Sequence, residues 1–348
     1  MTRKIEKAMV SGASGFIASW VVKRLLEEGV EVHGTVRSLQ NEEKVAHLRR
    51  MDAELPGTLK LFEADLLKEG SFDEAAAGCD TVFHLASPFV PFKVKDPQAE
   101  LVEPAVKGTA NVLGSVDRTA SVTRVVLTSS VASVMGDASE QPGAKRQAFS
   151  EEDWNQSSSL AHQPYSYSKV EAEKEAWRIA SAQERWKLVV INPSFVLGPT
   201  LSERTDATST GMVMEFLKGA YKSGVPALSF GVVDVREVAE AHLAAARIEE
   251  VEGRHIVSGP VLSMLEITEI IKKSYPERFP LPSGVLPKLL LYIFGPFQGF
   301  SWRYTRTNIG YSFSLDNSKS RESLGLNFRP SQETLKDQVD RLLEMGAV

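Results

Sequence analysis

Short apolar stretches alternate with longer amphipathic segments along the first half of the chain. The short stretches, such as KAMVS, carry few charges and are rich in residues that favour strands. The longer segments place apolar residues three and four positions apart, as on one face of a helix. We expect strands over 7–11, 30–37, 59–64, 81–86, 124–129 and 187–192, and helices over 16–28, 41–51, 97–118 and 164–183.

Strands separated by helical connections form βαβ units, and these units build a parallel sheet with helices on both faces. The sequence therefore predicts an α/β fold, a doubly wound parallel sheet of the Rossmann type. The pattern loosens after residue 192 into a segment rich in Ser, Thr and Gly, and a helical tail follows near 331–345. We assign 1–192 and 228–260 to the doubly wound domain, and 193–227 and 261–348 to a smaller C-terminal lobe.

Composition narrows the class of partner. The chain has 348 residues, with 40 basic and 45 acidic side chains and a formal net charge of −5, and neither sign forms a long run. This pattern lacks the basic footprint of a nucleic-acid-binding protein, so we expect a small-molecule partner. One cysteine, Cys79, excludes a disulfide framework and a Cys-rich metal site. We expect no metal and a monomer or a homodimer, with Cys79 packed as a small apolar residue.

Two segments bear on location. The N-terminal residues run from a charged lead into a strand pattern, without the apolar core and cleavage site of a secretory signal, so we expect a cytoplasmic protein. The stretch VLPKLLLYIFGPF at 285–297 is apolar, but Pro287, Lys288 and Gly295 interrupt it. Because it falls short of the roughly 20 residues that span a bilayer, we expect a buried helix of the smaller lobe rather than a membrane contact.

A glycine pattern follows the first expected strand. In VSGASGFIASW, Gly12 suits a tight bend, Gly15 suits close approach of the backbone, and Ala18 is small enough for helix and strand to pack. The free N–H groups and the dipole of the helix that begins here would face a pyrophosphate. This position in an alternating chain predicts a dinucleotide-binding loop.

The end of the second strand indicates which dinucleotide binds. An acidic residue there would bind the ribose hydroxyls of NAD, whereas an arginine would meet the 2′-phosphate of NADP. The stretch VHGTVRS ends in Arg37, and Lys44 lies a short helical distance beyond. A guanidinium and a second cation suit a phosphate with nearly two charges, so we expect NADPH or NADP⁺. Asp65, after the third strand, is expected to accept the adenine amino group.

The stretch PYSYSK supplies a candidate acid. On a helix Tyr165 and Lys169 share a face while Tyr167 points elsewhere. Hydride transfer to a carbonyl leaves an alkoxide that needs a proton, and Tyr165 is placed to give it, with Lys169 favouring the phenolate. LTSSVAS follows a strand, and we choose Ser130 over Ser129 to hydrogen-bond the carbonyl oxygen, because Ser129 would still belong to the strand.

Together these motifs resemble the extended short-chain dehydrogenase/reductase family. More narrowly, the chain is similar to the group that contains dihydroflavonol 4-reductase and the yeast methylglyoxal reductases. The likeness extends over nearly the whole chain, through GASGFIASWVVKRLLEEG, VFHLASP, KGTANVL, VVLTSSVASV, YSYSK, INPSFVLGP and VDVREVAEAHL.

The resemblance implies a role for each matched position. It places the pyrophosphate on the loop from Gly12 to Ile17, and it makes Ser130, Tyr165 and Lys169 the catalytic set. The residues that it implies for the cofactor are Gly12, Ser14, Gly15, Phe16 and Ile17 in the loop, Arg37 and Lys44 at the 2′-phosphate, Asp65 and Leu66 at the adenine, Leu85 and Ala86 at the ribose, Tyr165 and Lys169, Pro193 and Val196 at the carboxamide, and Ser209 over the pyrophosphate.

The substrate region departs from the plant reductases. Those enzymes place a polar residue just after the catalytic serine, where this chain has Val131, which argues against a flavonoid substrate. PYSYSK also lacks the tryptophan- and cysteine-containing motif of cinnamoyl-CoA reductases. Phe89, Val131, Met135 and Phe195 suggest an apolar pocket for an aromatic or alkyl ketone or aldehyde.

The expected function is therefore an NADPH-dependent carbonyl reductase. A nucleotide-sugar epimerase or dehydratase uses the same triad, but it normally prefers NAD and an acidic residue at the position of Arg37. A hydroxysteroid dehydrogenase associated with a membrane is a third interpretation, suggested by 285–297. A non-catalytic NADP-binding sensor would have lost Tyr165 or Lys169, and this chain keeps both.

Overall fold

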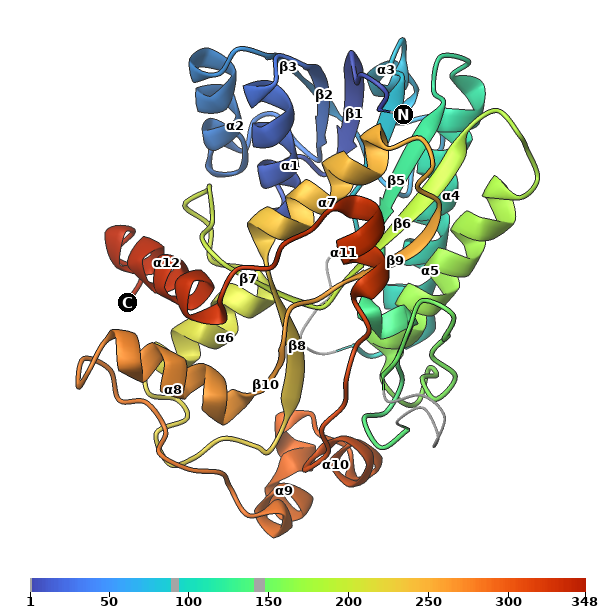
Figure 1. Cartoon of the computed structure of the whole chain (residues 1–348). Coiled ribbons are helices and arrows are strands. Elements are labelled where there is room, and N and C mark those ends of the chain that lie inside the picture. The colour runs from blue at the N-terminus through green and yellow to red at the C-terminus, as the bar shows by residue number, and fades with distance from the viewer. Residues whose placement is uncertain (1, 89–93, 141–147) are drawn as a thin grey trace.

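A sheet of seven parallel strands forms the centre of the protein (Figure 1). The structure is a computed structural model that describes residues 2–88, 94–140 and 148–348. The strand order is β3-β2-β1-β4-β5-β6-β9. The strands are β1 Lys7–Ser11, β2 Glu31–Val36, β3 Thr58–Glu63, β4 Thr81–His84, β5 Arg124–Thr128, β6 Lys187–Pro193 and β9 Gly253–Val257. The six expected strands are confirmed, and β9 adds a seventh that the pattern did not predict.

Helices cover both faces of this sheet, which confirms the doubly wound class (Figure 1). One layer contains α1 Phe16–Glu27, α2 Glu42–Glu54 and α7 Val235–Arg247, and the other contains α3 Asp73–Ala76, α4 Glu103–Arg118 and α5 Pro164–Ala180. Cys79 lies fully buried in the second layer, as expected. The helix expected from residue 97 begins with a π-helical turn, Gln98–Val102, before α4. Pro104 is the second residue of α4 and lies directly after the π-helical turn.

A second, smaller sheet belongs to the C-terminal lobe. It has the order β10-β8-β7, with β7 Phe195–Leu197, β8 Ser229–Asp234 and β10 Val261–Ser263. The helices of this part are α6 Thr208–Leu217, α8 Met264–Ser274, α9 Lys288–Phe294, α10 Trp302–Asn308, α11 Ser318–Leu324 and α12 Ser331–Glu344. β8 pairs in the small sheet, whereas α7, which follows it directly, packs on α1. The division of the chain at residues 192, 228 and 260 stays a prediction.

The apolar stretch at 285–297 does not form the buried helix that we expected. Its helix, α9, has seven residues, of which Leu291 is buried while Leu289 and Phe294 are 69% and 59% exposed. After Lys288 the helix has no charged residue that would mark an outer face, so its apolar composition wrongly indicated burial. Within the described residues, no helix has the length and apolar character needed to cross a membrane.

Candidate active site

The glycine loop lies where β1 meets β4. The Ser11 hydroxyl accepts hydrogen bonds from the backbone N–H groups of Leu85 and Ala86, each at 3.0 Å, and so ties the ends of the two strands together. Gly12 follows with φ +67°, and a Cβ on it would lie 3.0 Å from the Cα of Ala86. This close approach keeps the floor of the loop free of side chains. Ala86 and Leu85, predicted beside the ribose, thus lie next to the loop.

The first turn of α1 is suited to an anion. Gly15 is its N-cap, no side chain caps it, and no acidic residue lies in the first turn. The N–H groups of that turn and the positive end of the helix dipole therefore remain available to a phosphate. Ser14, Phe16 and Ile17 lie half-buried around this turn. The loop thus fits the dinucleotide pyrophosphate on its own geometry.

Two cations stand beyond the loop, as predicted. Arg37 follows the last residue of β2 and is exposed, and Lys44 is half-buried in the first turn of α2. Neither side chain forms an ion pair with any residue that the structure describes. Asp65, after β3, is exposed and its carboxylate accepts from the backbone N–H of Leu67 at 2.9 Å. Both cations are thus free to meet a 2′-phosphate.

The two serines after β5 take different directions. The Ser129 hydroxyl is buried and donates to Glu173 at 2.5 Å, so it is committed to the interior. Ser130 is half-buried and caps the 3₁₀ turn Val131–Ser133 by accepting from the backbone N–H of Ala132 at 3.1 Å. The choice of Ser130 as the substrate-facing serine agrees with this geometry.

Tyr165 and Lys169 lie one turn apart at the start of α5. The Nζ of Lys169 is 5.6 Å from the centre of the Tyr165 ring, and Tyr165 is 42% exposed. Lys169 also donates to the hydroxyl of Ser87 at 3.0 Å. Burial, and next to it the positive charge of Lys169, lowers the pKa of His84 to about 3. The expected pairing of Tyr165 with Lys169 is therefore present.

A pocket with about 390 Å³ of empty volume, part of it open to solvent, lies beside Lys169. It lies between the ends of β4 and β5 and the helices α4 and α5. Residues predicted for the cofactor or for catalysis that line it are Leu66, Ala86 and Lys169, and Ser87 and Thr128 line it as well.

A buried polar network lies beneath the serines and was not predicted. Glu173 is 1% exposed and forms an ion pair with Arg254 at 2.6 Å. Its carboxylate also accepts from Ser133 at 2.5 Å and from Asn192 at 2.9 Å. Because Glu173 lies one helical turn after Lys169, this network fixes α5 against the loop that carries Ser130.

Two further residues near the site, Ser87 and Arg204, were not predicted from the sequence. Ser87 holds Lys169, and Arg204 donates to the backbone oxygen of Ser14 at 3.4 Å, which brings the 199–207 segment over the glycine loop. Arg204 lies in a segment without hydrophobic periodicity, so no sequence pattern predicts that its side chain contacts the glycine loop. It is a third cation within reach of the cofactor loop.

The predicted nicotinamide and substrate residues are only partly brought together. Pro193 is buried at the end of β6, Val196 is half-buried in β7, and Ser209 is buried in the first turn of α6. Phe195 stacks on Phe230, with ring centres 5.0 Å apart. Val131 and Met135 instead pack around Val134, Phe149 and Phe313 in a separate apolar cluster. Phe89 lies outside the described residues.

A doubly wound sheet with this loop, together with relatives that are reductases, makes the protein an oxidoreductase that acts on carbonyl or CH–OH groups. The chain belongs to the NAD dependent epimerase/dehydratase family, whose model matches residues 8–259. This confirms the extended short-chain dehydrogenase/reductase resemblance drawn from the sequence.

Individual relatives are reductases. The chain is 37% identical to a cinnamoyl-CoA reductase of Medicago truncatula, over 96% of this chain and 95% of that protein. It is 36% identical to tetraketide alpha-pyrone reductase 1 of Arabidopsis thaliana, over 98% and 96% of the two chains. Among solved structures it is similar to the yeast methylglyoxal/isovaleraldehyde reductase Gre2 complexed with NADPH, with a TM-score of 0.79 and 30% identity over 98% of this chain and 99% of that chain.

Proposed function

We propose that the protein is an NADPH-dependent carbonyl reductase that converts apolar or aromatic ketones and aldehydes to alcohols. The observation that carries the proposal is the Tyr165–Lys169 pair at the start of α5. It is supported by the glycine loop and by Arg37 and Lys44, which form no ion pair with the residues that the structure describes. NADPH is favoured over NADH because Arg37 stands where an NAD-dependent relative would place an acidic residue.

Each residue of the set has a defined task in this reaction. When bound, NADPH supplies a hydride from C4 of its nicotinamide ring. Ser130 hydrogen-bonds the substrate oxygen, and Tyr165 donates its phenolic proton to that oxygen as the carbonyl carbon becomes a CH–OH carbon. Lys169 stabilises the phenolate that remains. The proton is then regained from solvent, which the partial exposure of Tyr165 permits.

The substrate class rests on the composition of the cleft and on the relatives. Val131, Met135 and Phe195 are apolar and half-buried, with Val131 directly after Ser130, although Val131 and Met135 pack in a different apolar cluster from Phe195. The names of the relatives cover an aromatic thioester, a polyketide pyrone and a small aldehyde. The chain lacks the cinnamoyl-CoA reductase motif around Tyr165, so we propose free carbonyl compounds rather than CoA thioesters.

The test is the loss of NADPH absorbance with a panel of aryl ketones, aliphatic aldehydes, diketones and a dihydroflavonol, with NADH in parallel. We expect turnover with NADPH and an apolar carbonyl. Tyr165→Phe should lower kcat by at least about 100-fold while NADPH binding persists, because only the proton donor is removed. The matched control, Tyr167→Phe, should stay within about twofold of the parent enzyme, because its ring does not face Lys169. No turnover with any carbonyl, or equal loss in the two variants, would contradict the proposal.

A further inference from the structure

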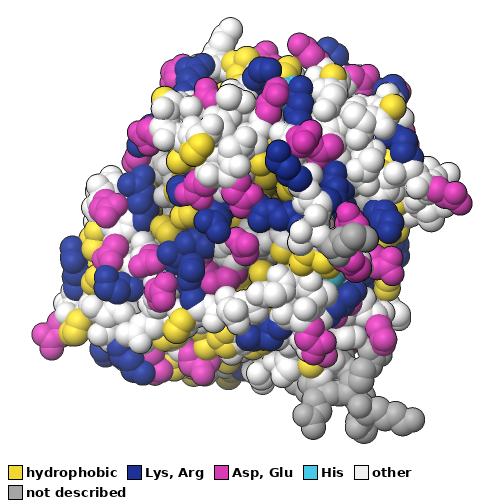
Figure 2. Space-filling view, turned by 45° about the horizontal axis from the view of Figure 1, so that its top comes forward, with side chains coloured by type: hydrophobic (Ala, Val, Ile, Leu, Met, Phe, Trp, Pro, Cys, Tyr) yellow, Lys and Arg dark blue, Asp and Glu magenta, His cyan; other side chains and the backbone are white. Residues whose placement is uncertain are grey.

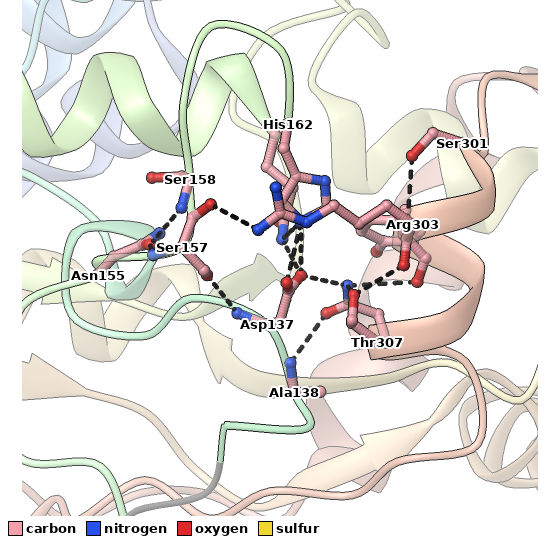
Figure 3. Close-up of polar contacts among 12 residues, drawn as sticks. Asp137, Ala138, Asn155, Ser157, Ser158, His162, Ser301, Arg303 and Thr307 are labelled. Atoms are coloured by element: carbon pink, nitrogen blue, oxygen red, sulfur yellow. Dashed lines mark hydrogen bonds and ion pairs between the residues drawn. The ribbon is translucent and has the colours of Figure 1, made fainter.

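A buried carboxylate, Asp137, joins three segments that lie far apart in the sequence. Figure 3 shows it between the segment that carries His162 and helix α10 with Thr307. Its side chain is 3% exposed. One segment is the loop after Ser130, to which Asp137 itself belongs, the second leads into Tyr165, and the third is α10 of the C-terminal lobe.

The oxygen atoms of Asp137 accept hydrogen bonds from both of the other segments. The His162 ring Nε2 lies 2.8 Å from one oxygen and 3.0 Å from the other. The Gln163 amide donates at 2.8 Å, and the Asn308 amide donates at 2.7 Å. In return the side-chain amide oxygen Oδ1 of Asn308 accepts from the backbone N–H of Ala138 at 3.0 Å, so the contact between this loop and α10 is reciprocal.

The carboxylate is held in its charged form. Burial opposes its ionisation, but hydrogen bonds from Asn308 and His162 outweigh burial and hold the pKa of Asp137 below its usual value. A buried charge that three side chains satisfy is stable where it lies, and removing any one partner leaves it under-satisfied.

The backbone at Gln163 is unusual and stands next to the catalytic helix. Gln163 is the N-cap of α5, with φ 53° and ψ 55°, and it does not cap its own helix through its side chain. A left-handed backbone is uncommon for a residue other than glycine and persists only where surrounding contacts enforce it. Here the contact is the hydrogen bond to Asp137, and Tyr165 follows two residues later.

We propose that Asp137 is a positioning residue that sets the orientation of Tyr165 and, through Asn308, aligns it with the lobe that covers the substrate. The inference rests on the proposed role of Tyr165. Asp137 touches neither the glycine loop nor Arg37 and Lys44, so we expect its effect to fall mainly on the carbonyl substrate, with the affinity for NADPH nearly unchanged.

The experiment measures turnover per NADPH-binding site for three variants. Asp137→Asn removes the charge, and Gln163→Asn keeps a residue that tolerates the left-handed backbone but is too short to reach Asp137. We expect kcat/KM for the carbonyl substrate to fall at least about tenfold in both, with the Kd for NADPH changed by less than about twofold. The reciprocal swap Asp137→Asn with Asn308→Asp restores a facing donor and acceptor to α10 but not to Gln163, because one Asp137 oxygen accepts from both Gln163 and Asn308. It should therefore recover little of the loss, and a large recovery would contradict the role of the Gln163 contact.

A matched control separates positioning from stability. Ser320→Ala removes another buried hydrogen bond between the C-terminal part and the sheet, from Ser320 to the backbone oxygen of Ile256 at 2.6 Å. It should lower the melting temperature without lowering turnover per binding site. Unchanged turnover per site in Gln163→Asn, or losses that only follow the folded fraction, would overturn the inference. Activity in Tyr165→Phe would instead overturn the catalytic assignment, so the two failures are distinguishable.

Discussion

At the scale of single residues, Arg37 tests the choice of cofactor. Its guanidinium is exposed and has no ion-pair partner among the described residues. A hydrogen bond between two charged groups contributes roughly 1.5–3 kcal/mol, which corresponds to about ten- to a hundredfold in affinity. We therefore predict that Arg37→Ala raises KM for NADPH about tenfold or more and leaves KM for NADH nearly unchanged.

The matched control for Arg37 is Arg49→Ala. Arg49 is also an exposed cation close to the second strand, but it already pairs with Glu42 and donates to the backbone oxygen of Leu39. Its removal makes the same change in net charge. Steady-state kinetics with both cofactors decide the matter, and equal effects of the two substitutions on NADPH would mean that Arg37 does not contact the phosphate.

Residue spacing explains which site residues were predictable. Tyr165 and Lys169 are four positions apart on one helix, so the helical repeat alone brings them together. Asp137 and Asn308 are 171 positions apart, and nothing local in the sequence indicates that they meet. Ser87 and Arg204 escaped for the same reason, because their contacts depend on how two distant loops return to the sheet.

At the scale of the element, two glycines that flank α1 allow backbone strain to be separated from cofactor binding. Gly12 and Gly29 both have positive φ, of 67° and 77°. A side chain at Gly12 would meet the backbone of Ala86 at 3.0 Å, whereas nothing lies within 4 Å at Gly29. A side chain at either position would therefore strain the backbone, but only a side chain at Gly12, in the cofactor loop, would also clash with a neighbour.

We predict that Gly12→Ala and Gly29→Ala each lower the free energy of unfolding by about 1–2 kcal/mol from backbone strain. Only Gly12→Ala should also weaken NADPH binding, because the added methyl group pushes β1 away from β4 beneath the pyrophosphate. Chemical denaturation and fluorescence titration of NADPH measure the two effects. Similar NADPH affinities in both variants would mean that the close contact at Gly12 is not needed for binding.

The elements of the large sheet were predictable for a physical reason. Residues 125–127 of β5 are all buried, so an uninterrupted apolar run marks a strand covered on both faces. The small sheet was not predicted because β7 and β10 have three residues each, too few for a pattern. The prediction for α9 was wrong because apolar composition does not indicate what packs against a helix.

At the scale of the whole molecule, most charged side chains lie at the surface, whereas the histidines are buried. Figure 2 shows acidic and basic side chains interspersed over one face. All six histidines are buried. Burial lowers the pKa of His47, His242 and His255 to about 4 and that of His84 to about 3, so these rings are neutral in the folded protein.

This distribution predicts acid sensitivity. The unfolded histidines take up protons near pH 6.5, whereas the folded ones resist until about pH 4, so the unfolded state binds more protons in this range. The free energy of unfolding should therefore fall as the pH drops from 6.5 toward 4, and these groups should add no pH dependence above 6.5. His242 alone contributes about 3 kcal/mol to the fall.

His242→Gln checks the assignment. The imidazole accepts from the Thr128 hydroxyl at 2.6 Å and donates to the backbone oxygen of Val238 at 2.7 Å, and glutamine offers one acceptor and one donor without titrating. Urea unfolding between pH 8 and pH 5 should give a shallower pH dependence for the variant. Parallel curves for the two proteins would show that His242 is not the group responsible.

The contacts of Asp137 with Gln163 and Asn308 also bear on the order in which the chain folds during synthesis. The glycine loop and the Tyr165–Lys169 pair lie within residues 12–169, and domains generally fold from the N-terminus as they emerge. Asn308, however, belongs to α10 and follows Asp137 by 171 positions, so it leaves the ribosome well after them. A nascent chain can therefore assemble its cofactor loop early, but the loop after Ser130 acquires its Asn308 partner only once those further residues have been synthesised.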